Sequence, residues 1–337
     1  MLNIAIIGPK FFGYTESIRN ELARKGYQVN LYDEFHSHSI FSKIFHRIGL
    51  HTLFSGGVSK HHAKLLLEMI NQHATDLFLM NPEVVGRNFI VKVKQHNIKV
   101  HLYMWDAVKN KNNFLKYIDL VNSRSSFDPI DCQRFGMTYI GLFSDQTLRS
   151  VARQVKKSTD IVFYGTLHSD RAKVLNQVKA YCKANGLSHH FFLYYYARWL
   201  FYIKCLLSPK NISFIKDISY KHFSRSQIDH LIQGAKFVLD LHHPNQHGLT
   251  MRTFEVLFSG ARLITFNALV SKCLPKNLLD RVLIINEVSD LYGHNLAIAT
   301  ALEPLDVDQK YYLSVERFVD ELLLNANKGL DKNTRLD

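Results

Sequence analysis

The chain has 337 residues, of which 47% are hydrophobic and 21% are charged. This length predicts two domains of roughly 150 residues each, and the composition argues against a disordered chain. Lys and Arg outnumber Asp and Glu by 42 to 29, which gives a formal net charge of +13. Such an excess favours polyanionic partners: nucleic acid, an anionic membrane surface or phosphorylated substrates. A basic surface that serves only solubility is the alternative.

The four cysteines lie far apart, and none belongs to a CxxC pair. Their spacing argues against a disulfide framework or a structural zinc site and fits a reducing compartment. The N-terminal residues resemble a strand rather than a secretory signal, and no stretch of about 18 uncharged apolar residues occurs. We therefore expect a cytoplasmic protein without a membrane-spanning helix.

The first 150 residues alternate between short apolar segments and amphipathic segments. We expect strands at 3–7, 28–32, 76–80, 99–103 and 117–121, and helices at 15–25, 59–73 and 84–96. Gly26 ends the first helix. Alternation of this kind predicts right-handed βαβ units and a parallel sheet.

A polar and basic stretch at 142–159 is the predicted linker, and a second series of elements follows it. We expect strands at 160–164, 236–241, 262–266 and 281–285, helices at 170–184 and 250–259, and a closing amphipathic helix at about 308–324. The order of strand, glycine loop and helix that begins at Ile4 thus recurs at Ile161. The predicted fold class is α/β, with two Rossmann-like doubly wound domains.

The segment 242–266 carries the most informative chemistry. A predicted strand ends at Leu241, and a predicted helix begins near Thr250. The N-terminus of such a helix offers unpaired backbone N–H groups and a partial positive charge, which together bind anions. Gly248 permits a close approach of the backbone to a ligand.

Two charged residues follow on this helix. Arg252 lies in the first turn, where its forked guanidinium can reach a phosphate. Glu255 lies three residues later on the same face, and its carboxylate can accept hydrogen bonds from a ribose diol. An ordinary crossover helix, with Arg252 and Glu255 as a surface ion pair, explains the same residues equally well.

The pattern Gln-x-Gly-Leu-Thr-x-Arg-x-x-Glu, from Gln246 to Glu255, is followed by Gly-Ala-Arg-Leu-Ile-Thr at 260–265. It resembles bacterial GT-B glycosyltransferases, and more closely the CgeB-like group of capsule, lipopolysaccharide and spore-coat saccharide synthesis. The segments 103–108, 126–131 and 161–171 resemble other loops of the same group. The resemblance implies two domains that face each other across a nucleotide-sugar cleft. They are an N-terminal acceptor domain at 1–150, on which a helix at about 308–325 packs back, and a C-terminal donor domain at 158–305.

The resemblance also implies roles for individual residues. In retaining relatives two glutamates are separated by seven residues: the second contacts the ribose and matches Glu255, and the first lies near the donor sugar, where this chain has His247. Gly13 lies in the loop after the first strand, where open α/β sheets bind ligands, although a simple turn glycine is the alternative. The implied donor-binding residues are Gly13, Gly165, Arg171, Gln246, Gly248, Leu249, Thr250, Arg252 and Glu255.

An inverting transfer needs a base that deprotonates the acceptor hydroxyl. Asp106 follows a predicted strand and is favoured over Asp128 and Asp131 in the next loop, although a capping or structural aspartate is the alternative. His247 is the second catalytic candidate. One of six early histidines is another alternative: His36, His38, His46, His51, His61 and His62.

No metal and no cofactor are expected. The pair His36-x-His38 has no carboxylate or cysteine at metal-ligand spacing, and no DxD-like motif is evident. Arg252 and Arg171, with the helix N-terminus, would instead stabilise the departing nucleoside diphosphate. The nucleotide-sugar is a substrate in this interpretation.

The segment 191–225 is unusually aromatic and basic. Eight of the twelve residues from Phe191 to Tyr202 are aromatic, and the whole segment has six Lys and Arg against one acid. This composition suits the interface of an anionic membrane or stacking on single-stranded nucleic acid. A buried strand and helix is the alternative. We predict peripheral contact with the inner face of the cytoplasmic membrane and expect no nucleic acid.

The predicted function is metal-independent transfer of a sugar from a nucleotide-sugar donor to a saccharide or lipid-linked acceptor, in bacterial surface polysaccharide synthesis. A nucleotide-sugar epimerase or hydrolase on the same fold is the first alternative. A nucleic-acid-binding protein is the second, and no helix-turn-helix, RNP or zinc pattern supports it.

Overall fold

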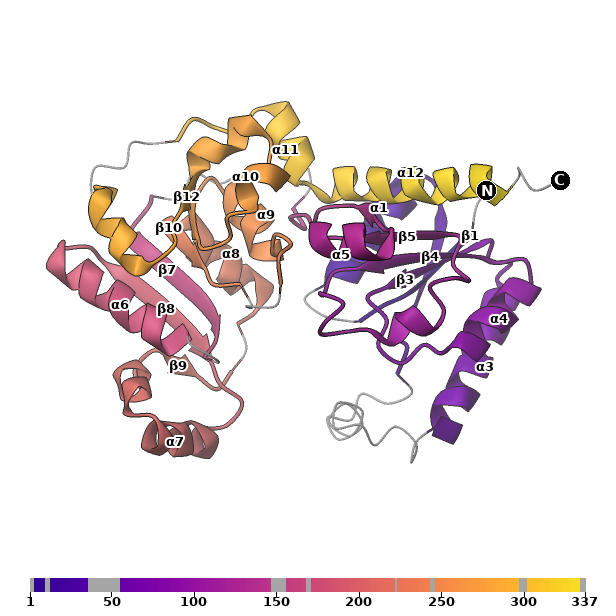
Figure 1. Cartoon of the computed structure of the whole chain (residues 1–337), viewed down its shortest axis with the longest axis horizontal. Coiled ribbons are helices and arrows are strands. Elements are labelled where there is room, and N and C mark those ends of the chain that lie inside the picture. The colour runs from indigo at the N-terminus through magenta and orange to yellow at the C-terminus, as the bar shows by residue number, and fades with distance from the viewer. Residues whose placement is uncertain are drawn as a thin grey trace. The chain divides into compact units, whose positions relative to one another are not determined.

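The structure is a computed structural model that describes residues 3–9, 13–35, 55–146, 156–167, 171–221, 223–242, 246–296 and 302–333 (Figure 1). The chain divides into two compact units. Unit 1 comprises Met1–Asp145, Asn245–Gly248 and Val315–Asp337, and unit 2 comprises Gln146–Pro244 and Leu249–Ser314. Each unit is built around a parallel sheet of its own.

The sheet of unit 1 has six parallel strands in the order β2-β1-β3-β4-β5-β6. Their bounds are β1 Asn3–Ile7, β2 Gln28–Tyr32, β3 Asp76–Met80, β4 Lys99–Met104, β5 Ser123–Ser126 and β6 Thr138–Tyr139. All five residues of β3 are buried. Parallel sheets are covered on both faces, so their strands read as continuous apolar runs rather than alternating ones.

The helices of unit 1 cover both faces of this sheet, as Figure 1 shows, with α1 and α12 on one face and α3 and α4 on the other. The core lies between these layers, and its buried side chains include Ile7, Leu79, Ile90 and Met104. The bounds are α1 Tyr14–Arg24, α3 Ser55–Asn71, α4 Arg87–Gln95, the 3-10 helix η2 Asn113–Lys116, α5 Pro129–Phe135 and α12 Val315–Asn333.

One predicted strand of unit 1 is wrong. The apolar run at 117–121 follows η2 as turns, and the fifth strand is the polar β5, whose sequence is Ser-Arg-Ser-Ser. The buried hydroxyls of this strand find partners inside the sheet: Ser123 bonds the His101 ring at 2.9 Å, and Ser125 donates to the Leu102 carbonyl at 3.1 Å. A buried polar strand is stable when its groups are paired in this way, but it carries no apolar signal.

The sheet of unit 2 has six parallel strands in the order β12-β11-β10-β7-β8-β9. Their bounds are β7 Thr159–Thr166, β8 His189–Tyr194, β9 Ile218–Ser219, β10 Ala235–Asp240, β11 Arg262–Thr265 and β12 Val282–Ile284. The chain moves outward from β7 to β9 and then returns to the other side of β7. The strand order therefore reverses between β7 and β10.

The helices of unit 2 are α6 Arg171–Ala184, α7 Arg198–Leu207, α8 Arg225–Gln233, α9 Met251–Phe258, α10 Val270–Cys273 and α11 Val307–Leu313, with the 3-10 helices η3 Pro209–Phe214, η4 Lys276–Arg281 and η5 Val288–Gly293. Leu175 and Val178 of α6 pack on Phe163, Phe191 and other buried side chains of the sheet. The strand β8 buries Phe191 and Leu193, so the first part of the aromatic segment is a core strand.

The closing helix, predicted as one element at about 308–324, is two helices. Ser314 interrupts it with an extended backbone, φ −86° and ψ 164°, between α11 and α12. The chain passes from unit 2 to unit 1 at this residue. A residue with this backbone ends a helix, and the apolar period of the two helices does not reveal it.

The predicted fold class, α/β with two Rossmann-like doubly wound domains, is confirmed by the two parallel sheets. Within the described residues, no helix combines the length and the apolarity needed to cross a bilayer. The four cysteines are free thiols.

Candidate functional site

The candidate site of unit 2 lies where β7 and β10 end side by side. Open α/β sheets bind ligands at the carboxyl ends of the strands, at the point where the strand order reverses. Here the connection after β7 contains Gly165 and leads to Arg171 at the start of α6. The connection after β10 begins at Leu241 and leads to α9, which carries Arg252 and Glu255.

Gly165 lies beside both arginines of the site. Its φ of +152° is rarely adopted by residues that have a side chain. A Cβ at this position would lie 3.5 Å from the guanidinium of Arg171 and 3.5 Å from that of Arg252. Both guanidinium groups therefore lie beside this glycine, whose left-handed backbone rather than lack of space disfavours a side chain.

Arg252 ties the end of β7 to the end of β10. Its Nη2 donates to the Tyr164 carbonyl at 2.5 Å, and its Nη1 donates to Asp240 Oδ1 at 3.2 Å. The guanidinium also stacks on the ring of Tyr164, 4.2 Å from the centroid. Its buried Nε has no hydrogen-bond partner within the described residues.

Arg171 makes a second bridge over the same two strand ends. Its Nη1 donates to the Thr166 carbonyl at 3.0 Å, and its Nη2 donates to the Leu241 carbonyl at 2.7 Å. Burial, followed by the positive charge of Arg252, lowers the pKa of Arg171 to about 10. Two adjacent cations in a poorly hydrated place favour the binding of an anion there.

Glu255 is buried, and its carboxylate pairs with Arg225 of α8. It also accepts a hydrogen bond from the hydroxyl of Tyr164 at 3.3 Å. The surface ion pair between Arg252 and Glu255, considered from the sequence, does not form. Arg252 pairs with Asp240 instead, because both strand ends offer it acceptors. Burial, followed by the charge of Glu255, raises the pKa of Tyr164 well above its usual range.

The start of α9 is shaped by Thr250, which occupies the N-cap position without capping the helix through its side chain. The Thr250 hydroxyl donates to Asp240 Oδ2 at 2.9 Å instead. Leu249 is buried beside it. The helix N-terminus, whose N–H groups attract anions, thus follows directly on the connection that Arg171 and Arg252 hold.

The remaining predicted site residues lie in unit 1. Gly13 is the N-cap of α1 with φ 76°. The half-buried Gln246, the exposed His247 and the buried Gly248 belong to the Asn245–Gly248 segment of this unit. Asp128 caps α5, accepting from the N–H of Ile130, and its Oδ2 also accepts from the N–H of His247 at 2.9 Å.

Asp106 follows β4, as predicted for a base. Its side chain is 34% exposed, and the carboxylate lies 3.6 Å from Lys111 Nζ. The neighbouring candidate Asp131 accepts the backbone N–H of Val108 at 2.8 Å, and burial raises its pKa. Asp128 and Asp131 therefore hold the backbone, and Asp106 is more accessible than the buried Asp128.

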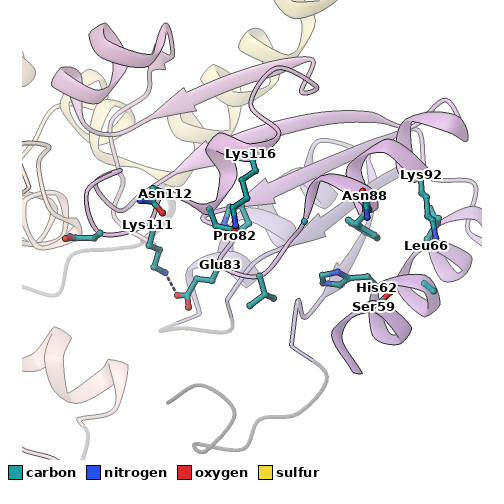
Figure 2. Close-up of a pocket in the computed structure, with 16 residues that line it drawn as sticks. Ser59, His62, Leu66, Pro82, Glu83, Asn88, Lys92, Lys111, Asn112 and Lys116 are labelled. Carbon is teal, nitrogen blue, oxygen red and sulfur yellow. Dashed lines mark hydrogen bonds and ion pairs between the residues drawn. The ribbon is translucent and has the colours of Figure 1, made fainter. Parts of the chain in front are cut away.

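Unit 1 also has a cavity of about 780 Å³ at the carboxyl edge of its sheet, shown in Figure 2. The connections after β3 and β4 line it together with α3 and α4. Lys92, Lys111 and Lys116 supply positive charge, and Figure 2 shows Lys111 reaching Glu83. His62, buried in its wall, has a pKa lowered to about 4 by burial first and then by His61.

Sequence reasoning missed three residues of the site in unit 2: Tyr164, Arg225 and Asp240. Asp240 ends a buried apolar strand, which is a usable signal for a functional acid. Tyr164 and Arg225 lie 91 and 30 residues from Glu255, and no local pattern connects them. Among the early histidines, His36, His38, His46 and His51 lie outside the described residues. Within the described ranges no cluster of three or more His, Cys, Asp or Glu could hold a metal ion.

No protein-family model matches this sequence, and no curated protein matches it significantly. Solved structures match it over nearly its whole length. A UDP-GlcNAc 2-epimerase from Neisseria meningitidis, bound to UDP-GlcNAc, has a TM-score of 0.58 at 7% identity and covers 97% of this chain and 100% of its own. Anabaena HepE in complex with UDP and glucose has a TM-score of 0.57 at 10% identity, with 100% of both chains covered.

A glycosyltransferase from Rickettsia africae also matches, with a TM-score of 0.55, 10% identity and 98% of both chains covered. Identities this low establish the architecture and leave the reaction open. The two parallel sheets and these matches together show that the chain has the GT-B fold of nucleotide-sugar epimerases and glycosyltransferases.

Proposed function

We propose that this chain is a glycosyltransferase that uses a nucleotide-sugar donor, and that the donor diphosphate binds in unit 2 at the ends of β7 and β10. The observation that carries the proposal is the pair Arg171 and Arg252, held against Gly165 at the point of strand reversal. Forked guanidinium groups are well suited to a diphosphate because they offer two parallel N–H donors.

The charges around the two arginines support this role. Arg252 pairs with Asp240, whereas Arg171, within the described residues, donates only to backbone carbonyls, and burial first and then the positive charge of Arg252 lower the pKa of Arg171. A bound diphosphate would place negative charge beside Arg171, and the same arginines would stabilise the negative charge on the leaving nucleotide. The reaction would then need no metal, since the protein supplies the cations.

The other parts of the proposal follow the sequence interpretation. The ribose would bind near Glu255, with Arg225 and Tyr164 holding that carboxylate in position. The cavity of unit 1 would hold a saccharide or lipid-linked acceptor. Asp106 and His247 remain the proposed catalytic residues, and surface polysaccharide synthesis remains the proposed setting.

A nucleotide-sugar 2-epimerase is the second candidate function, because the matched structures include epimerases as well as transferases. The two activities differ in their need for an acceptor. An epimerase converts the donor alone into an isomeric nucleotide-sugar. A transferase leaves the sugar of the donor unchanged until an acceptor is present.

The first experiment is a thermal-shift screen against UDP, GDP, CDP, dTDP, CMP and their common sugars, with and without EDTA. A ligand at 100 times its Kd should stabilise the fold by about 2.7 kcal/mol. We expect one nucleotide to raise the midpoint, independently of EDTA. Arg252→Lys keeps the charge but loses the fork and should weaken binding by at least about tenfold. Glu255→Gln should weaken it as well.

Arg198→Ala, which removes one positive charge from α7 of the same unit, is the matched control and should leave the nucleotide shift unchanged. A wild-type chain that binds no nucleotide would refute the proposal. For the reaction itself, the responsive donor is incubated with the protein alone and followed by NMR. An isomeric nucleotide-sugar would establish the epimerase instead of the transferase.

A further inference from the structure

The helix α7 has two apolar faces, of which the fold of unit 2 uses only one. Phe201 and Cys205 point inward and are 1% and 7% exposed. Lys204, between them, also turns inward, and its Nζ donates to the Leu167 carbonyl at 2.5 Å. Figure 1 shows α7 on the side of unit 2 where β9, the edge strand of the sheet, lies. The inward face therefore anchors the helix to its unit.

The outward face of α7 is apolar as well. Five large side chains follow the spacing i, i+3, i+4, i+7 and i+8, which places them on one side of a helix. Leu206 and Leu207 are 83% and 82% exposed. The five residues are Trp199, Tyr202, Ile203, Leu206 and Leu207. An apolar stripe of this size on a surface marks an interaction site.

Neighbouring segments extend the stripe. Tyr196, just before α7, is 72% exposed, and Ile212 and Ile215, in and after η3, are 52% and 46% exposed. We call this surface, from Tyr196 to Lys216, the α7 face. It combines aliphatic side chains with Trp and Tyr, which are the residues favoured at the boundary between lipid and water.

The charges of the α7 face have one sign. The sequence from 196 to 216 contains four Lys and Arg and no Asp or Glu. Three of the basic residues are exposed around the apolar stripe: Arg198, Lys210 and Lys216. The first acid after them, Asp217, forms an ion pair with Lys179 at 2.5 Å. A partner that complements this surface is apolar at its centre and anionic at its rim.

We propose that the α7 face binds the surface of an anionic lipid bilayer, with α7 lying in the plane of the interface. The helix has 10 residues and is about 15 Å long, which is too short to cross a bilayer and suits an interfacial position. Trp199 and the leucines would enter the acyl boundary, while Arg198, Lys210 and Lys216 would contact the lipid phosphates. This inference does not depend on the proposed reaction.

The test is co-sedimentation of the full chain with vesicles of phosphatidylcholine alone and of phosphatidylcholine mixed with phosphatidylglycerol. We expect binding to the mixed vesicles that is at least about tenfold stronger than to the neutral ones and that weakens with salt. The surroundings of Trp199 should also become less polar on binding. Its fluorescence is isolated in a Trp105→Phe variant, and its emission should shift to the blue on binding.

Two double variants separate the apolar and charged contributions. Leu206→Ser with Leu207→Ser, and Lys210→Glu with Lys216→Glu, should each reduce vesicle binding at least about tenfold without lowering Tm, because these side chains are exposed. Leu67→Ser changes a leucine on α3 that is 61% exposed and is the matched control, which should bind vesicles normally.

The possible outcomes are distinct. Unchanged vesicle binding in both double variants would overturn the proposal. The proposal would also be overturned if the wild type formed a dimer that does not bind vesicles and the double leucine variant were monomeric. That result would assign the α7 face to contact with a second copy of the chain. The nucleotide screen is independent: variants of the α7 face should keep their nucleotide shift, and Arg252→Lys should keep its vesicle binding.

Discussion

Glu34 shows how one buried side chain orders a distant connection. It lies just after β2 and is 1% exposed. Its carboxylate accepts the backbone N–H groups of Glu83 at 2.9 Å and Val84 at 3.0 Å, 49 and 50 residues further along the chain. These residues begin the connection from β3 to α4, which lines the cavity of unit 1. Glu34 thus shapes the cavity without lining it.

The titration of Glu34 gives a prediction about pH. Burial raises its pKa from 4.5 to about 7, against the opposing effect of the N–H donors of Val84 and Glu83. The folded chain therefore keeps this proton between pH 4.5 and 7 while the unfolded chain loses it, so Glu34 favours folding as the pH falls through this range. Relative to Glu34→Gln, the wild type should gain at most about 3 kcal/mol between pH 7.5 and 4.5. Urea unfolding at several pH values measures the difference.

His62 has the opposite effect, because its lowered pKa makes folding less favourable below pH 6.5. It is present in both chains and cancels in the comparison. The control is Asp119→Asn, because the hydrogen bond from Arg87 lowers the pKa of Asp119. Relative to this variant, the wild type should gain no stability as the pH falls. A difference between wild type and Glu34→Gln that is independent of pH would contradict the prediction.

At the scale of elements, the helix α8 carries Arg225, the ion-pair partner of Glu255. A capping box fixes the residue at which α8 begins. The Ser224 hydroxyl accepts the N–H of Gln227 at 3.3 Å, and the Gln227 side chain accepts the N–H of Ser224 at 3.0 Å. Arg225 is the first residue of the helix. The cap therefore determines where the guanidinium that binds Glu255 emerges.

Removing this cap should destabilise unit 2. Ser224→Ala is expected to lower the free energy of unfolding by about 1 kcal/mol, because one helical N–H loses its acceptor. Ser224→Asp should restore it, since aspartate is an equally good cap. Ser226→Ala changes an exposed serine of the same helix and should have an effect below about 0.5 kcal/mol. Equal effects of Ser224→Ala and Ser226→Ala in urea denaturation would show that the capping box contributes nothing.

At the scale of the whole molecule, unit 1 depends on the C-terminal end of the chain. Phe318 of α12 is completely buried and packs against Tyr103 and Phe143, with ring centroids 4.9 and 4.6 Å apart. Its neighbour Arg317 donates to the carbonyls of Gly141 and Leu142. The helix therefore completes one face of a sheet whose strands all come from the first half of the chain.

Unit 1 includes α12, which is distant in the sequence from its strands. A substitution in α12 should therefore destabilise unit 1 and leave unit 2 unchanged. Phe318→Ala should cost about 3–5 kcal/mol, because it leaves a cavity between α12 and the sheet. Hydrogen exchange should accelerate in β4 and β5 and remain unchanged in β7 and β10. Leu324→Ala, at a position of the same helix that is 54% exposed, should leave all four strands protected. Equal acceleration in both units would mean that they unfold together and would contradict the prediction.

Sequence by itself determined the fold class and most of its elements. The strands at 3–7, 28–32 and 76–80 were predicted with the bounds that the structure has. The strands at 3–7 and 76–80 are buried apolar runs, and the edge strand at 28–32 follows the turn at Gly26. The glycine loop and the two arginines of unit 2 were also proposed as site residues from the sequence. What identified them was their order along the chain and a family resemblance.

Only the tertiary structure decided which groups face each other. Arg252 pairs with Asp240 rather than with Glu255, and Glu255 pairs with Arg225, because sheet topology brings the ends of β7 and β10 together. The periodicity of apolar residues likewise did not predict the polar strand β5 or the break at Ser314. A hydrogen bond depends on the positions of two groups in space. Local sequence patterns therefore determine most of the elements, and tertiary packing determines the contacts of the site.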